Sequence, residues 1–289
     1  MNPEMLLNLC SFSYFDLPQN LVRRLETGET VPLAAAAARL KRMNERGTLR
    51  CGAYLGNIDA MLDAIAGYSL DILAYENDNR DTGFVAYAFG SGDREVIAAM
   101  RGSERAGECA PTNVDWRDNF CAPLVGSVQY AEAARFLDRF PEGSLLATGH
   151  SKGGNVALWA QSRAQNPLAR AAVFNAQGFA KKELTSEQIA RMRRGAVNYV
   201  VAGDPVGALL YHPEIRVYIR QVPGTNPHAP NAYTFNAEGW PVRAHRTLAS
   251  IGIEALSRLL VSLNESDGFV RRALQFLTTR VLRCPNVPA

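Results

Sequence analysis

One heptapeptide constrains the fold of this chain more than any other segment. Residues 149–155 read Gly-His-Ser-Lys-Gly-Gly-Asn, and they follow the short apolar run Ser144–Thr148. A helical pattern begins directly after them, near Val156. Glycines on both sides of Ser151 leave room for a very tight turn, at which a Cβ atom would collide with the neighbouring strand and helix. The segment therefore predicts a sharp strand-to-helix turn with the Ser151 hydroxyl exposed at its apex.

The sequence around this turn predicts alternating strands and helices. Residues 1–70 are expected to be mostly helical, and the runs Phe84–Phe89 and Glu95–Met100 are expected to form a β-hairpin across a turn at 90–93. Further along, periodicity predicts helices over Val128–Phe140, from the turn to about Ala164, and over Ser186–Arg194 with Ser186 as N-cap, and strands over Ala171–Phe174, Val197–Val201 and Arg216–Ile219. Such alternation is typical of a mostly parallel sheet with helices on both faces, the α/β-hydrolase-like arrangement.

We expect a single domain over residues 1–289, because no internal repeat or low-complexity linker interrupts the sequence. A helical segment over 1–70 precedes a core over 80–240, and amphipathic helices over 247–282 follow, with a break near Asp267. The apolar stripe of this C-terminal region is expected to pack against the core rather than to contact a membrane. It consists of Leu248, Ile251, Ile253, Leu256, Leu259, Leu260 and Leu263.

Charge and cysteine content limit the partners and the compartment. A formal net charge of +3 is too small to indicate nucleic-acid binding. The five cysteines are scattered and never form C-x-x-C, which argues against a disulfide framework or a zinc site and fits a reducing compartment. No signal peptide is visible, and no stretch reaches the roughly 18 apolar residues of a membrane span. We expect a cytoplasmic protein with no metal, no cofactor and no stable membrane span, whose oligomeric state the sequence leaves open.

A serine hydroxyl becomes a good nucleophile when a base, usually a histidine held by a carboxylate, removes its proton. In the predicted fold the acid follows the serine along the chain, in a loop after a later strand. Asp204 meets this condition at the exit of Val197–Val201, where neighbouring Pro and Gly residues fix the turn. Glu214 and Asp267 are the alternatives, although Asp267 beside a glycine is better explained as a solvated helix cap.

The chain contains four histidines, one of which should be the base. His150 lies inside the turn with its side chain expected to point away from the hydroxyl, so a structural role is favoured. His212 follows Asp204 by only eight positions and is poorly placed to reach over the sheet. His228 lies in a Pro-rich loop after a strand, where catalytic residues of such sheets gather. We therefore expect His228 to be the base, with His245 as the second choice.

The tetrahedral intermediate of acyl transfer needs two hydrogen-bond donors. The first is expected to be the backbone N–H of Lys152, the residue after the nucleophile, whose side chain is taken as incidental. The second is expected to be the N–H of Ser103, in the loop that leaves the hairpin. Residues 116–118 could brace that loop, with an ion pair between Arg101 and Asp118 as one hypothesis.

Several of these segments together resemble the bacterial Mbeg1-like family, a domain of unknown function placed among class 3 (fungal-type) lipase-like α/β-hydrolases. The resemblance runs from about residue 10 to residue 240, and the heptapeptide is its most specific part. It is carried by Ser13–Pro18, Arg101–Ser103, Trp116–Asp118, Gly149–Asn155, Phe174–Phe179, Gly203–Gly207 and Pro227-His228. The resemblance implies an α/β-hydrolase with Ser151, Asp204 and His228 as triad, and it implies no particular substrate.

These observations make a serine hydrolase of the esterase or lipase type the leading hypothesis, acting on a small-molecule or lipid-like ester through an acyl-enzyme. Two alternatives remain open: a catalytically silent hydrolase fold used as a binding module, and a thioesterase or acyltransferase that uses the same residues. The loop over Glu104–Asp115 is longer and more polar than the apolar lid of a secreted lipase, which argues against triglycerides.

Overall fold

The computed structural model describes residues 2–51, 55–91, 95–104, 118 and 126–265. These residues form one eight-stranded sheet in the order β1-β2-β3-β4-β5-β6-β7-β8. Its strands are β1 (Val31–Pro32), β2 (Asp71–Asp78), β3 (Phe84–Gly90), β4 (Glu95–Met100), β5 (Ser144–Gly149), β6 (Arg170–Phe174), β7 (Ala196–Val201) and β8 (Ile215–Ile219). The helices are α1 (Pro3–Phe12), α2 (Gln19–Glu26), α3 (Leu33–Glu45), α4 (Ile58–Ala66), α6 (Tyr130–Asp138), α7 (Lys152–Arg163), α8 (Ser186–Gly195) and α9 (Leu248–Glu265), with 3-10 turns η1 (Lys181–Glu183), η2 (Val206–Ala208) and η3 (Pro230–Ala232).

The sheet is antiparallel at its beginning and parallel in the remainder. β1 to β4 pair antiparallel, and β4 to β8 pair parallel, each with the next strand along the chain. Crossovers between parallel strands are right-handed in nearly all proteins, so a strand order that never reverses puts the crossover helices on one face. α6, α7 and α8 accordingly line one core with that face of the sheet. The α/β class is therefore as predicted, and β3 with β4 forms the predicted hairpin.

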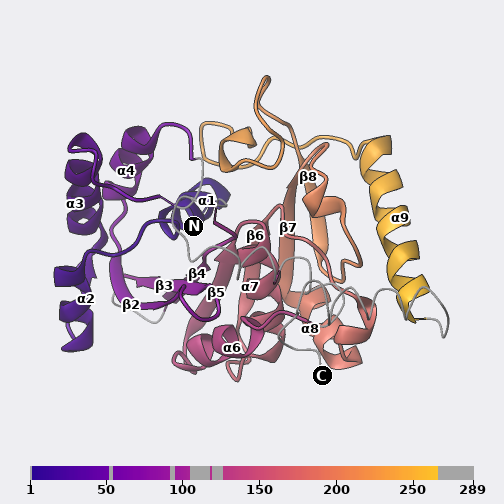
Figure 1. The fold of residues 1–289 in the computed structure, drawn as a ribbon, viewed down its shortest axis with the longest axis horizontal. Helices are drawn as coiled ribbons and strands as arrows, with labels where there is room; N and C mark the ends of the chain where they lie inside the picture. Colours follow the sequence, from indigo (N-terminus) through magenta and orange to yellow (C-terminus); the bar gives the residue numbers. More distant parts are fainter. Residues whose placement is uncertain (1, 52–54, 92–94, 105–117, 119–125, 266–289) are drawn as a thin grey trace.

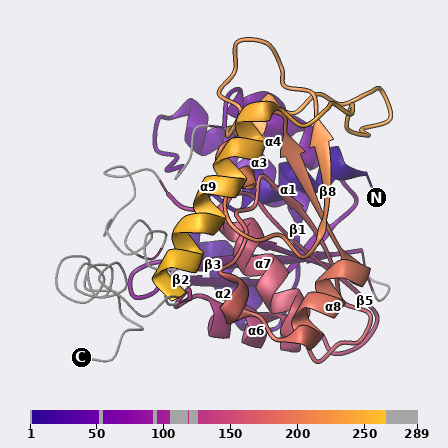
Figure 2. The same ribbon diagram turned by 90° about the vertical axis from the view of Figure 1, so that its right-hand side faces the viewer.

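The opposite face of the sheet is covered by the N-terminal helices. Side chains alternate along β3, where Tyr87 and Phe89 pack in one core while Ala86 and Ala88 pack in the other. The first of these cores includes α1 to α4. Figure 1 shows α2, α3 and α4 gathered beside β2 and α9 at the β8 end of the sheet, and Figure 2 shows α9 crossing in front of that end.

The connection after α1 is pinned to the centre of the sheet by a buried arginine. The Arg101 guanidinium donates to the carbonyl oxygens of Ser13 at 2.5 Å and Phe15 at 2.9 Å. It also forms ion pairs with Asp16 at 2.8 Å and Glu104 at 2.5 Å. The predicted ion pair between Arg101 and Asp118 is therefore wrong, because the segment after α1 and Glu104 bind the guanidinium instead.

Residues 1–70 are mostly helical, as expected, whereas the N-cap expected for α8 is wrong. No prediction covers β2, which has few apolar residues and ends in Glu76-Asn77-Asp78. Thr185, not Ser186, caps α8: its side chain accepts from the N–H of Gln188, and the Gln188 side chain accepts from the N–H of Thr185. The break near Asp267 lies outside the described residues.

Four residues of the predicted C-terminal apolar stripe do not pack in the core as expected, while Ile253 is half-buried. Leu248, Ile251, Leu256 and Leu259 are 86%, 45%, 59% and 54% exposed. The helix instead packs by its polar side, where Ser250 and Ser257 are buried. Amphipathic spacing identified the helix, but it could not show which side faces the protein.

Candidate active site

Ser151 stands on a strained turn between β5 and α7. Its φ of 58° and ψ of −127° are rarely adopted by a residue with a side chain. The turn is closed by neighbouring glycines: a Cβ at Gly149 would collide with the backbone of Gly153, and one at Gly153 with the carbonyl of Met100. At Gly154 it would come within 2.7 Å of a side-chain carbon of Ala176. The close approach of α7 to the ends of β4, β5 and β6 therefore requires these glycines. The turn presents Ser151, which is half-buried, at the carboxyl edge of the sheet.

Parallel strands end at this same edge, and each brings a polar residue to it. Asp204 follows β7, and His228 lies in the segment after β8. His228 Nε2 lies 2.9 Å from Ser151 Oγ, and His228 Nδ1 lies 2.9 Å from Asp204 Oδ1. The structure thus brings together the three residues that the sequence predicted, in the order hydroxyl, imidazole, carboxylate. Such an arrangement can move a proton from a serine hydroxyl to a ring nitrogen.

The Asp204 side chain is completely buried and held by backbone groups of η2. Its Oδ2 accepts the N–H of Gly207 at 2.6 Å, and its Oδ1 accepts the N–H of Val206 at 3.4 Å. A Cβ at Gly207 would lie 2.9 Å from Oδ2, so glycine allows the backbone to approach this closely. With the ring of His228 as third partner, the carboxylate is fixed toward the imidazole.

The loop that carries His228 is fastened by two residues at other strand ends. Asn175, directly after β6, donates from Nδ2 to the carbonyl of Pro227 at 3.0 Å. His150 lies 2.8 Å through Nε2 from the carbonyl oxygen of His228 itself. Within the loop, the N–H of His228 donates to Oδ1 of Asn226 at 3.0 Å. The backbone of His228 is therefore held on both sides, and this positions its imidazole.

His150 is neutral, which defines its role in this contact. Burial lowers the pKa of its ring from 6.5 to about 3, and the nearby His228 acts in the same direction. Because a carbonyl oxygen can only accept, the Nε2–H of His150 is the donor. The ring centroids of His150 and His228 lie 5.0 Å apart. The ring of His150 thus supports the His228 loop, in keeping with the structural role expected for it.

Lys152 has a larger part than the incidental one expected of its side chain. Its ammonium lies 3.0 Å from Oδ2 of Asp118, and the two side chains are 2% and 1% exposed. Asp118 also accepts the hydroxyl of Ser127 at 2.5 Å and the N–H of Val128 at 3.1 Å. A buried ion pair therefore ties the first turn of α7 to the chain before α6.

Ser103, the second expected oxyanion donor, is half-buried. It follows Gly102, at which a Cβ would collide with Tyr14 Oη and with the carbonyl of His150. This close packing places the Ser103 loop against the residue that precedes Ser151. Trp116 and Arg117, expected to brace the loop, lie outside the described residues.

The alternative acids and bases are placed elsewhere. His212 Nδ1 lies 2.7 Å from Glu214 Oε1, and both side chains are fully buried in this pair. His245 is exposed before α9, and Asp267 lies outside the described residues. Among the described residues, no group of three or more His, Cys, Asp or Glu side chains could hold a metal ion.

Sequence reasoning missed Asn175 and the partners of His150 and Lys152. Asn175 gave a signal that could have been used, because it is a polar residue directly after a buried strand; the structure places it at φ 45°. Its Oδ1 also accepts the N–H of Val201 at 2.9 Å, so it joins β7 to the His228 loop.

The chain matches a protein-family model and is similar to several solved structures. A protein-family model described as Mbeg1-like matches residues 69–261. A solved structure described as a fungal lipase is 12% identical, with 86% of this chain and 88% of that chain covered and a TM-score of 0.45. The Lip2 lipase from Yarrowia lipolytica is also 12% identical, with 86% and 87% covered and a TM-score of 0.40. No curated protein matches the sequence.

Proposed function

This chain belongs to the Mbeg1-like family, and we propose that it is a serine hydrolase that cleaves carboxylic esters through an acyl-enzyme. The observation that carries the proposal is the chain of contacts from Ser151 Oγ through His228 to Asp204, each 2.9 Å long. A strained φ at Ser151 supports it, because strain of this kind persists where the surrounding structure imposes it and is concentrated at active sites.

The tautomer of His228 follows from its partners. The Asp204 carboxylate only accepts, so Nδ1 of His228 carries the proton and donates to Oδ1. Nε2 then presents its lone pair to the hydroxyl of Ser151. In this state the imidazole is a base aimed at the nucleophile, and the buried carboxylate stabilises the imidazolium that forms when the proton arrives.

In the proposed reaction Ser151 Oγ attacks the ester carbonyl carbon while His228 Nε2 takes the hydroxyl proton. The carbonyl oxygen becomes an oxyanion, which the backbone N–H groups of Lys152 and Ser103 stabilise. His228 returns the proton to the leaving alcohol as the ester bond breaks, and the acyl-enzyme remains. Water then attacks this intermediate with His228 again as base, and the acid product leaves with Ser151 restored.

Labelling with a fluorophosphonate tests the proposal directly. The wild-type protein should be labelled covalently, and Ser151→Ala should not. Ser91→Ala is the matched control, because Ser91 is an exposed serine at the end of β3. Folded wild-type protein that takes up no label would contradict catalysis and favour a silent binding module.

The acyl group of the substrate can be addressed with p-nitrophenyl esters of increasing chain length. We expect hydrolysis that Ser151→Ala and His228→Ala both abolish, since nucleophile and base act as one unit. Preference for short chains would define an esterase, and preference for long chains a lipase. Release of the acyl group to a thiol or alcohol faster than to water would identify an acyltransferase.

A further inference from the structure

Helix α9 shows an unusual distribution of its side chains. Apolar residues at helical spacing face outward, and they are Leu248, Ile251, Ala255, Leu256 and Leu259. The other exposed large apolar side chains of the described residues, Leu168, Ile215 and Trp240, are scattered over separate segments. A surface helix normally buries its apolar stripe and leaves its polar side in water. Most of the described apolar side chains of α9 are exposed instead.

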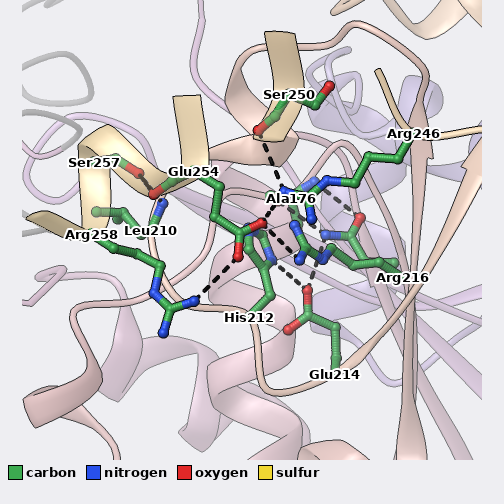
Figure 3. Close-up of polar contacts among 11 residues, drawn as sticks. Ala176, Leu210, His212, Glu214, Arg216, Arg246, Ser250, Glu254, Ser257 and Arg258 are labelled. Carbon is green, nitrogen blue, oxygen red and sulfur yellow. Dashed lines mark hydrogen bonds and ion pairs between the residues drawn. The ribbon is translucent and has the colours of Figure 1, made fainter. Parts of the chain in front are cut away.

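The polar side of α9 is attached by specific contacts, shown in Figure 3. The carboxylate of Glu254 accepts from Arg216 on β8 at 2.9 Å and also from Arg246. One turn further, the hydroxyl of Ser257 accepts the N–H of Leu210 at 2.9 Å. These contacts fix the rotation of the helix about its axis, so the apolar side cannot turn inward without breaking them.

The surface beneath α9 is charged, which reinforces this orientation. His212 and Glu214 form a fully buried pair there. Burial opposes the charged form of Glu254, but Arg216 and Arg246 outweigh it and lower the pKa of that carboxyl below its usual value. Glu254 is therefore ionised at neutral pH and bound to cations. An apolar side chain in its place would leave these cations without their partner.

A cluster of exposed apolar side chains on one helix marks an interaction surface. Its edge is positively charged, since Arg258 is 55% exposed and shares the carboxylate of Glu254 with Arg216 and Arg246. Three arginines around one carboxylate leave an excess of positive charge there, and Glu265, the other acid of α9, lies at the C-terminal end of the helix. A second copy of the chain would bring the same positive edge against itself, whereas anionic lipid headgroups complement it.

We propose that α9 is a membrane-docking helix that lies in the plane of an anionic bilayer, with Leu248, Ile251, Leu256 and Leu259 inserted between the headgroups. At about 1.5 Å per residue its 18 residues extend about 27 Å. No described helix is long and apolar enough to cross a membrane. The mode is that of amphipathic in-plane helices, in which buried apolar area and attraction to anionic lipid act together.

Flotation with lipid vesicles tests the proposal without relying on any hydrolytic activity. The full chain should float with vesicles of phosphatidylcholine mixed with phosphatidylglycerol, more strongly than with phosphatidylcholine alone, and added salt should weaken binding. Leu256→Ser/Leu259→Ser should lower partitioning by about tenfold or more. Arg258→Gln should lower it about fivefold. Leu168→Ser, a leucine 62% exposed outside α9, is the matched control and should bind as wild type.

Any of four results would overturn the proposal. The wild type could fail to float with either vesicle, or the double serine variant could float as well as wild type. Alternatively, sedimentation could show a dimer that the double variant dissociates, which would assign this face to a second copy. Thermal unfolding is the folding control: the variants should match wild type, and a clear loss of stability in the double variant would show that the chain itself covers the face.

Discussion

Replacing Lys152 with methionine should lower the free energy of unfolding by about 3–5 kcal/mol. The ammonium lies 3.0 Å from the Asp118 carboxylate, with the two side chains 2% and 1% exposed. Methionine fills similar space without charge, so Lys152→Met leaves a carboxylate in the interior with neutral donors from Ser127 and Val128. These two hydrogen bonds are already present in the wild type, so they do not replace the attraction of the lost cation.

Urea unfolding followed by circular dichroism at neutral pH measures this loss, provided that the m-value is unchanged. The double variant Lys152→Met/Asp118→Leu removes both charges and should recover to within about 2 kcal/mol of wild type. Lys41→Met is the matched control, because Lys41 pairs with Asp63 at the surface and such pairs contribute little. If Lys152→Met costs no more than Lys41→Met, the argument from burial is refuted.

Strain at Ser151 should lower the stability of the protein. Ser151→Gly is free of the penalty at φ 58°, so its free energy of unfolding in urea should exceed that of Ser151→Ala by about 1–3 kcal/mol. Equal free energies of unfolding would argue against strain. The folded state holds His150 neutral, with its pKa lowered to about 3 by burial and by His228. The unfolded chain therefore binds more protons below about pH 6.5, and stability falls from there toward pH 3, by about 2 kcal/mol at about pH 5. His150→Asn should flatten this slope in urea titrations. Glu254→Gln should loosen α9 from Arg216 and Arg246, so limited proteolysis should cut the helix faster than in wild type.

The sequence predicted those features that depend on short-range signals. The glycines around Ser151 can serve only a tight turn, and Asp204 sits in a turn whose glycine and proline restrict the backbone. Strand ends in an α/β fold share one edge, so position alone indicated His228. The acid, base and nucleophile are separated by 24 and 77 positions, yet each was recognisable in its own loop.

Features that depend on which surfaces meet could not be read from the sequence. Arg101 has acidic residues at several distances along the chain, and only the packed fold shows that Asp16 and Glu104 reach it while Asp118 pairs with Lys152. The period of α9 defines an apolar side but not its direction, because the arginines that bind Glu254 come from β8 and from before the helix. Tertiary contacts decided both cases.

The strand order has a consequence for how the protein matures on the ribosome. Strands join the sheet one after another at the same edge, and the imidazole comes from beyond the final one. A nascent chain therefore exposes its serine well before any base exists to activate it, so shortened translation products should be inert. Helix α1 is made before the sheet, yet the arginine that holds the connection after it follows Ser13 by 88 positions. The connection after α1 can therefore be fixed only after β4 has been made.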